Sequence, residues 1–224
     1  MTHIETEIVA LKKEIANMWI LVQSQLNKAR EAMVNFDKDL AREVLVKEKR
    51  VNSFELKIDR DCENIFALYC PVAVDLRFLL AALKINTNLE RIGDIAAGVA
   101  KYVIDSTAGF DKKVLEATDV IRMYDEAINI VIDTRTAFEN EDTALARSVF
   151  KHDEMLDVVN RNANTAVGEV IKGDITMLNE ALFILSIIRK LERIGDQSKN
   201  IAEEIIFYVE AKILKHSGAS RQKA

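Results

Sequence analysis

Residues 89–94 and residues 191–196 both read LERIGD, so one six-residue string recurs 102 positions later in a chain of 224 residues. A recurrence of this length is very hard to attribute to chance in so short a chain. Uncharged apolar runs at residues 78–83 and 181–188 lie just upstream of the two copies. The sequence therefore predicts an internal duplication, with one copy of a structural unit in each half of the chain.

The spacing of apolar residues predicts long α-helices around both copies. Apolar residues from Ile4 to Phe36 recur at steps of mostly three and four, which is the period of one helix face. We expect Asp37 or Asp39 to cap the second helix, Pro71 to lie in the first turn of the third, and Gly173 to end the fifth, with Asp174 capping the sixth. The expected helices cover residues 4–36, 37–69, 71–106, 114–138, 143–173 and 174–216.

These helix lengths indicate how the chain folds. Helices of roughly 30 to 40 residues are about 45 to 60 Å long, which is too long for a compact globin-like arrangement. Short connections make sequential helices antiparallel neighbours. We therefore expect an all-α protein of two tandem three-helix bundles, with six long antiparallel helices, the first bundle at residues 1–109 and the second at residues 110–224.

Composition disfavours several classes of protein. The chain has 31 Lys and Arg against 36 Asp and Glu, a net charge of -5, which argues against nucleic-acid binding through phosphate neutralisation. Cys62 and Cys70 are separated by about 12 Å along one helix, beyond disulfide reach, as suits a reducing cytosol. The amino terminus lacks a signal-peptide pattern, and uncharged stretches are too short to cross a bilayer. We expect a cytoplasmic protein.

Each copy of LERIGD carries a pair of carboxylates. Glu90 with Asp94, and Glu192 with Asp196, stand four residues apart and so project from one helical face. The like charges repel by a few tenths of a kcal/mol, and the glycine between them costs about 1 kcal/mol relative to alanine. Both copies repeat the carboxylate pair and the glycine despite these costs, so we expect the two features to have a function. A carboxylate pair is a natural ligand set for a hard cation.

The preceding helix of each unit offers further oxygen ligands. Glu48 and Asn52 stand four apart on the second helix, and Asp153 and Asp157 stand four apart on the fifth. If each pair faces the neighbouring LERIGD helix, every unit presents four ligands near one surface. Such oxygen-rich sites suit Fe, Mn, Mg or Zn.

Two alternatives stay open at this point. The carboxylates also fit a solvated helix face with local ion pairs to Arg91 or Arg193, and His152 either joins the second site or is simply solvated. An enzyme is disfavoured, because the chain has no Glu-x-x-His pair of a di-iron oxidase, no glycine-rich phosphate loop, no nucleophile elbow and no zinc-binding Cys or His cluster.

Beyond the two signatures, three stretches carry a resemblance to a known family. They are PVAVDLRFLL at residues 71–80, the Val51 and Asn52 pair after Glu48, and ERIGDQSKNIAEEIIFYVEA at residues 192–211. Together with the duplicated LERIGD, they make the chain resemble the PhoU family over nearly its full length. Neither composition nor bundle architecture alone would generate this combination.

The resemblance implies two three-helix bundles related by pseudo-twofold symmetry, and a dimeric regulator instead of a catalyst. Members of the family couple a phosphate ABC transporter, through its ATPase, to a membrane sensor histidine kinase, and repress the starvation response when phosphate is plentiful. Some carry iron or zinc clusters, so Fe, Zn or Mn is the implied cofactor. By position, the first metal site comprises Glu48, Asn52, Glu90 and Asp94, and the second comprises Asp153, Asp157, Glu192 and Asp196.

The chain departs from the family pattern in its first half. Asn52 supplies a neutral amide where a second acid would bind a cation more strongly, and Gly98 stands where the second copy has Asn200. We therefore expect the first site to hold metal less tightly than the second. The alternative function is a helical scaffold or metal-storage bundle with no role in phosphate signalling.

Overall fold

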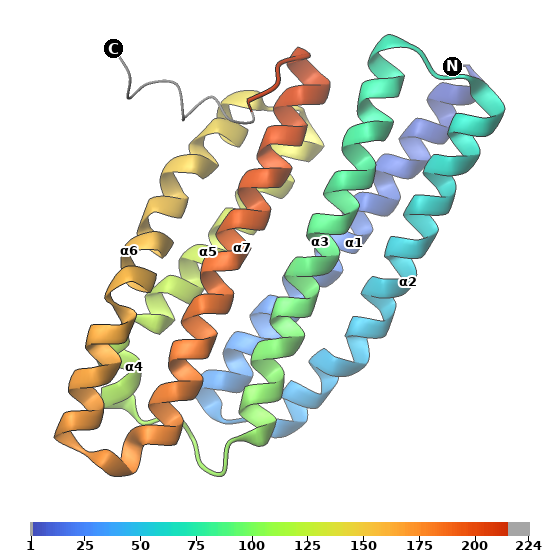
Figure 1. The fold of residues 1–224 in the computed structure, drawn as a ribbon. Helices are drawn as coiled ribbons and strands as arrows, with labels where there is room; N and C mark the ends of the chain where they lie inside the picture. Colours follow the sequence, from blue (N-terminus) through green and yellow to red (C-terminus); the bar gives the residue numbers. More distant parts are fainter. Residues whose placement is uncertain (1, 215–224) are drawn as a thin grey trace, which may run out of the picture.

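The computed structural model describes residues 2–214, and within them the chain is helical without any strand (Figure 1). The all-α prediction is confirmed. Seven α-helices and one short 3-10 helix lie in this range: α1 (His3–Asn35), α2 (Lys38–Tyr69), α3 (Ala73–Asp105), α4 (Lys112–Thr118), α5 (Val120–Asn140), α6 (Thr143–Gly173), η1 (Ile175–Met177) and α7 (Leu178–Glu210).

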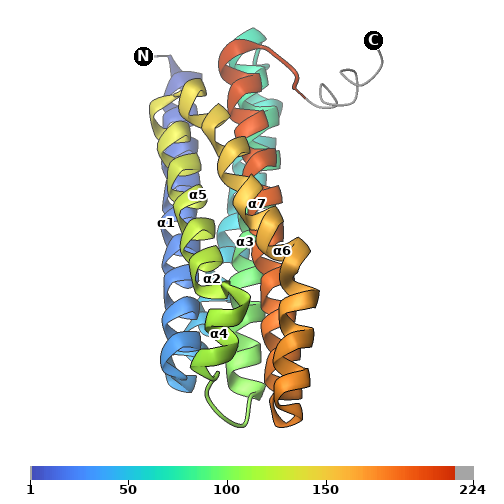
Figure 2. The same cartoon turned by 90° about the vertical axis from the view of Figure 1, so that its left-hand side faces the viewer.

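The helices form two antiparallel bundles that stand side by side (Figure 1). The first unit consists of α1, α2 and α3, and the second consists of α4 with α5, α6 and α7. The units meet where α3 packs along α7 and α1 packs against α5, and Figure 2 shows this second pair of helices side by side. The predicted pair of tandem three-helix bundles is confirmed.

Contacts between α3 and α7 follow the sequence repeat. The Nδ2 atom of Asn200 donates to the Oδ1 atom of Asn88 at 3.3 Å. At the other end of the interface Lys190 lies over Gly98, so that a Cβ atom on Gly98 would stand 2.7 Å from the lysine Nζ. Asn88 and Lys190 are 102 positions apart, as are Gly98 and Asn200. The two contacts are therefore equivalent, as a pseudo-twofold axis between α3 and α7 requires.

Aspartate side chains cap the amino termini of most of the helices that follow α1. Asp37 Oδ1 accepts from the amides of Asp39 and Leu40 at 3.0 and 2.9 Å, and so satisfies two donors that the helix leaves free. Asp142 caps α6 and Asp174 caps η1 in the same way. The predicted cap at Asp37 is confirmed, whereas Asp174 caps the short η1 and not the long helix α7 that was predicted to follow it, because α7 begins only after Met177, which forms no side-chain cap.

Several predicted helix ends differ from the structure. The predicted fourth helix is divided at Asp119, whose left-handed φ of 54° breaks the chain into α4 and α5. The third helix begins at Ala73, two residues after Pro71, because the chain turns irregularly with φ of 46° at Cys70. Gly173 is the last helical residue of α6, and Asp174 ends that helix in an extended conformation. The last helix ends at Glu210, where Ala211 is left-handed, and residue 216 lies outside the described range.

One hydrophobic core runs through both units. Trp19 of α1 is fully buried, and its indole Nε1 donates to the carbonyl of Val131 in α5 at 3.2 Å. Its ring lies 5.5 Å from that of Phe138, centroid to centroid. Within residues 2–214, the helices lack the long apolar stretch that a membrane crossing requires. The contacts of Trp19 with Val131 and Phe138 make the interface between the units part of this hydrophobic core.

Candidate functional site

The four carboxylates predicted for the second unit come together between α6 and α7. Burial raises the pKa of the Glu192 carboxyl, and the charges of Asp196, Asp157 and Asp153 raise it further. Asp153 is the most deeply placed, with 3% of its surface exposed, and its Oδ1 atom has no hydrogen-bond partner among residues 2–214. The neighbouring α7 can approach this closely because residue 195 is glycine, with no side chain to displace the carboxylate.

Lys199 of α7 is the cation of this cluster. Its Nζ forms an ion pair with Asp153 and lies 2.9 Å from Oδ1 of Asp196. Burial alone would lower the pKa of Lys199, but its hydrogen bonds to Asp153 and Asp196 outweigh burial and raise the pKa. Lys199 is not among the predicted site residues, although its position three residues after Asp196, on the same helical face, is the available signal.

The first unit gathers a different set of carboxylates from the predicted one. Glu90 and Asp94 of α3 lie together, Glu55 of α2 interacts with both through its charge, and Asp59 lies next to Glu55. Asn86 of α3 holds this group in place, because its Nδ2 donates to the carbonyl of Glu55 at 2.9 Å and to Oδ1 of Asp59 at 2.8 Å. Burial, the charges of Asp94 and Glu55, and a hydrogen bond to Asp94 raise the pKa of Glu90 to about 7.

The two predicted ligands of α2 take different places in the structure. Glu48 lines a neighbouring cleft that also contains Asp94, and Asn52 is exposed on the surface of α2. The sequence carried a signal for Glu55, which stands 102 positions before Asp157. By the same offset, Val51 is the counterpart of Asp153 and packs against Gly93 as Asp153 does against Gly195. The first unit therefore places an apolar side chain where the second places its most buried acid.

Both clusters have the chemistry of a hard-cation site. The second offers four carboxylates, one of them with a buried and unpartnered oxygen, and this donor set fits Fe, Mn or Zn. In the arrangement that the structure describes for residues 2–214, no three His, Cys, Asp or Glu side chains converge closely enough to share one ion. Lys199 supplies the positive charge between the carboxylates instead. Metal binding stays a prediction for both units.

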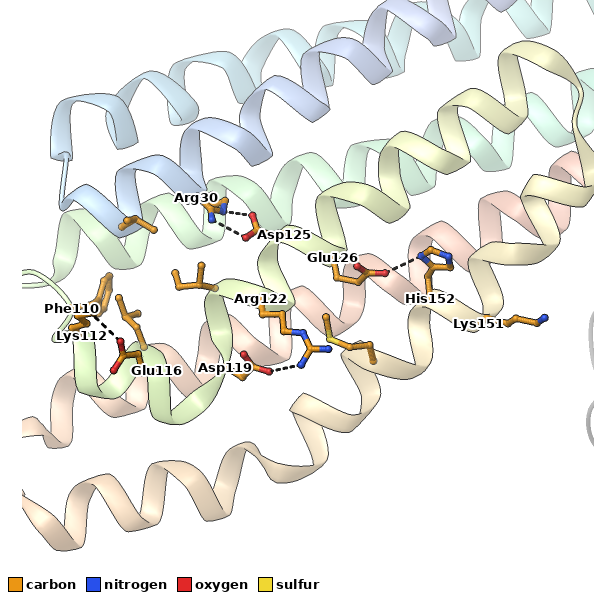
Figure 3. A pocket seen from close by; sticks show the side chains of 14 residues that line it. Arg30, Phe110, Lys112, Glu116, Asp119, Arg122, Asp125, Glu126, Lys151 and His152 are labelled. Atoms are coloured by element: carbon orange, nitrogen blue, oxygen red, sulfur yellow. Dashed lines mark hydrogen bonds and ion pairs between the residues drawn. The ribbon is translucent and has the colours of Figure 1, made fainter.

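A larger cleft of about 1200 Å³ lies between α1, α4, α5 and α6 (Figure 3). It opens because α5 packs against α1, whereas α4, beyond the break at Asp119, does not. His152 belongs to this cleft, with its Nδ1 2.9 Å from Oε1 of Glu126, and not to the carboxylate cluster beside Asp153. Most charges here are paired within the chain: Arg30 with Asp125, Lys112 with Glu116, and Arg122 with Asp119.

Comparison with known proteins gives a consistent result. A family model described as the PhoU domain matches the chain twice, at residues 15–103 and residues 120–205. The chain is 31% identical over 216 residues to the phosphate-specific transport system accessory protein PhoU homolog 1 of Thermotoga maritima, covering 95% of this chain and 91% of that protein. It is 29% identical to the PhoU accessory protein of Escherichia coli K12, covering 95% and 87%.

Solved structures show the same architecture. The crystal structure of PhoU from Pseudomonas aeruginosa superposes with a TM-score of 0.87 at 30% identity, covering 93% of this chain and 99% of that one. The structure of the phosphate transport system regulatory protein PhoU from Streptococcus pneumoniae superposes with a TM-score of 0.82 at 25% identity, covering 95% and 99%. With one domain match in each unit, and with relatives aligned over nearly the whole length, the chain belongs to the PhoU family.

Proposed function

We propose that this protein is a cytoplasmic negative regulator of phosphate uptake and of the phosphate-starvation response. The observation that carries the proposal is the match of both units to the PhoU domain, together with relatives named as phosphate-specific transport system accessory proteins. Cys62 and Cys70 are both free, in keeping with a reducing compartment. The protein acts as a regulator and not as an enzyme.

The proposed mode of action is contact with other proteins, namely the ATPase of a phosphate ABC transporter and a sensor histidine kinase. Two equivalent apolar patches, one in each unit, support this mode. Leu76 and Leu80 at the start of α3 are 37% and 41% exposed, and Leu178 and Leu182, their counterparts 102 positions later, are 38% and 46% exposed. Large apolar side chains exposed at equivalent places in both units suit a protein interface. The two patches lie at opposite ends of the molecule, because α3 and α7 run antiparallel (Figure 1), and we assign both to the transporter ATPase.

A deletion strain tests the regulatory role. Loss of the gene is expected to change phosphate uptake and to leave starvation genes expressed in phosphate-rich medium, and the intact gene is expected to restore repression. Unchanged uptake and gene expression, in a strain without a second copy of such a gene, would contradict the proposal.

Purified partners test the contacts. The full-length protein is expected to capture the transporter ATPase and the kinase, and the double variant Leu80→Ser, Leu182→Ser is expected to lose the ATPase. Val46→Ser is the control, because Val46 is 70% exposed on α2 and belongs to neither patch. A helical scaffold or metal-storage bundle, the alternative function, would capture neither partner. Light scattering tests the proposed homodimer, which requires twice the chain mass of 25.3 kDa.

Metal binding is a separate part of the proposal. Fe, Zn or Mn would be held by Asp153, Asp157, Glu192 and Asp196 in the second unit, and less tightly in the first. The buried and unpartnered oxygen of Asp153 supports this assignment. A bound ion would supply positive charge between the carboxylates in place of Lys199. Regulation by protein contacts does not depend on it.

A further inference from the structure

A cleft of about 450 Å³ between the two units is lined by cations from both copies of the repeat. Arg91 belongs to the first LERIGD string and Arg193 to the second, and Lys101 and Lys190 join them from α3 and α7. The chain as a whole carries a net charge of -5. The presence of four cations in this cleft therefore does not follow from the overall charge of the chain.

These four cations form no ion pair with a carboxylate in the part of the chain that the structure describes, although the charge of Arg91 acts on Glu90. Neither Arg91 nor Arg193 forms an ion pair or hydrogen bond there, and the same holds for Lys101 and Lys190. Glu48, Asp94 and Asp105 also line the cleft, yet none of them forms an ion pair with the four. In the cleft of Figure 3, by contrast, three of the lining cations are paired with acids.

The backbone of α3 makes room for one of these cations. Lys190 crosses from α7 onto Gly98, and a Cβ atom at residue 98 would stand 2.7 Å from Nζ and 2.9 Å from Cε. The Nζ atom also lies 5.8 Å from the centre of the Tyr102 ring. The lysine is thereby held at the interface, with its ammonium group directed to the cleft instead of free in solvent.

The pseudo-twofold mate of this cleft provides a comparison within the same molecule. At the positions 102 residues away, Glu203 replaces Lys101, Asn88 replaces Lys190 and Asn200 replaces Gly98. The mate is a smaller cleft of about 360 Å³, and its own lysine, Lys84, is paired with Glu204 at 3.0 Å. Arg91 lines both clefts, but only the cleft with Lys101 and Lys190 carries lysines that form no ion pair in the described residues.

We propose that the cleft lined by Arg91, Lys101, Lys190 and Arg193 binds an oxyanion of the phosphate class. A phosphoryl group accepts several N–H donors at once, and arginine donates to it in a bidentate manner. The volume accommodates either free orthophosphate or the phosphoryl group of a nucleotide. The inference stands independently of the proposed role in phosphate transport, since it rests only on the charges and shape of the cleft.

Calorimetric titration and phosphorus NMR of the full-length protein test the site, with orthophosphate, ATP and sulfate as separate probes at low ionic strength. Orthophosphate or ATP is expected to bind with a Kd of about 1 mM or lower, and more weakly as salt is added. Tighter binding of ATP assigns the site to a nucleotide, and tighter binding of orthophosphate assigns it to the free ion.

The double variant Lys101→Glu, Lys190→Asn gives the cleft the residues of its mate, and we expect it to weaken binding at least about tenfold. Lys13→Glu, Lys113→Asn is the matched control, because it changes the net charge equally at exposed positions outside the cleft. Lys101→Ala alone serves if the double variant does not fold, as circular dichroism reports. Absence of binding by orthophosphate and ATP, equal binding by the variant, or equal affinity for sulfate would overturn the assignment.

Discussion

Asp153 of α6 lies so close to Gly195 of α7 that a Cβ atom on residue 195 would stand 2.1 Å from the Oδ1 atom of Asp153. Leu156 adds a second close neighbour, with Cδ1 2.9 Å from the same point. The glycine of the second LERIGD string is therefore required by packing, since any side chain at that position would displace a buried carboxylate. In the first unit the nearest atom to Gly93 is Cγ1 of Val51, at 3.2 Å.

The glycines of α3, α6 and α7 are expected to respond differently to alanine. Gly195→Ala should lower the free energy of unfolding by roughly 2 to 3 kcal/mol, because overpacking exceeds the gain in helix propensity. Gly93→Ala should change it by less than about 1 kcal/mol. Gly168→Ala is the control and should stabilise by about 0.5 to 1 kcal/mol, because no atom lies within 4 Å of its Cβ position. Urea unfolding measures all three, and equal effects at Gly195 and Gly168 would contradict the packing argument.

Lys199 is expected to stabilise the second cluster in a pH-dependent manner. Lys199→Met removes the cation of the cluster, so the pKa values of Asp153 and Glu192, which burial already raises, rise further in the folded chain. A carboxyl group whose pKa is raised in the folded chain destabilises the fold as pH increases. The free energy of unfolding of the variant should therefore be lower than that of the wild type by roughly 2 kcal/mol at pH 8, and by less at pH 5.

Urea unfolding at both pH values measures this difference. Lys172→Met is the control, because Lys172 forms only an exposed ion pair with Glu169. A loss for Lys199→Met that does not depend on pH would show that the lysine acts through packing alone.

Glu90 is expected to make the first unit less stable at alkaline pH. Its pKa is raised from 4.5 to about 7, so the folded chain holds the proton more tightly than the unfolded chain does. The resulting contribution of Glu90 to the free energy of unfolding is complete below about pH 4.5 and is lost as pH rises to about 7. Because the side chain is partly exposed, solvent screening reduces it to about 1 kcal/mol. Glu90→Gln should remove that part of the pH dependence, and carbon NMR of labelled Glu90 should show titration near pH 7.

Metal content is expected to depend on the second cluster. Elemental analysis of protein purified without chelator or affinity nickel should show Fe, Zn or Mn, and Glu192→Gln, Asp196→Asn should remove most of it. Glu90→Gln, Asp94→Asn should remove less. The Lys199→Met variant should bind the ion more tightly, because it lacks the ammonium group that competes for the carboxylates. Intact protein that contains no metal, even after incubation with these ions, would end the metal proposal.

The two units are expected to unfold together. Trp19 is the only tryptophan, and its hydrogen bond to Val131 joins the units through α1 and α5. Its fluorescence and the helical circular dichroism should therefore give one coincident urea transition. Two separate transitions would show that the interface contributes little to stability. Trp19→Phe keeps most of the apolar volume and should lower the transition midpoint without dividing it.

Much of the fold could be predicted because helix periodicity is a local property. The stripe from Ile4 to Phe36, the cap at Asp37 and the repeated LERIGD each depend on residues near one another in the sequence. The break at Asp119 could not be predicted in this way, since the apolar spacing continues across it. Backbone conformation at a single polar residue is decided by the packing of both flanking helices.

The site could be predicted only where one helix determines it. Glu90 with Asp94 and Glu192 with Asp196 follow from spacing on α3 and α7. The register of α2 against α3 decides which acidic residues of α2 lie next to Glu90, and the apolar stripe of α2 is compatible with several registers. The structure places Glu55 there, with Asp59 next to Glu55, and places Glu48 in the adjacent cleft.

The sequence by itself determined that this chain is a duplicated helical protein of the PhoU type with a carboxylate pair in each half, because those features are written in local spacing and in an internal repeat. Only the tertiary structure decided that Lys199 neutralises one cluster, that Asp153 is buried against Gly195, and that four cations meet between the units. These relationships join residues on different helices. They depend on interhelical register, which is determined by side-chain packing across the whole bundle.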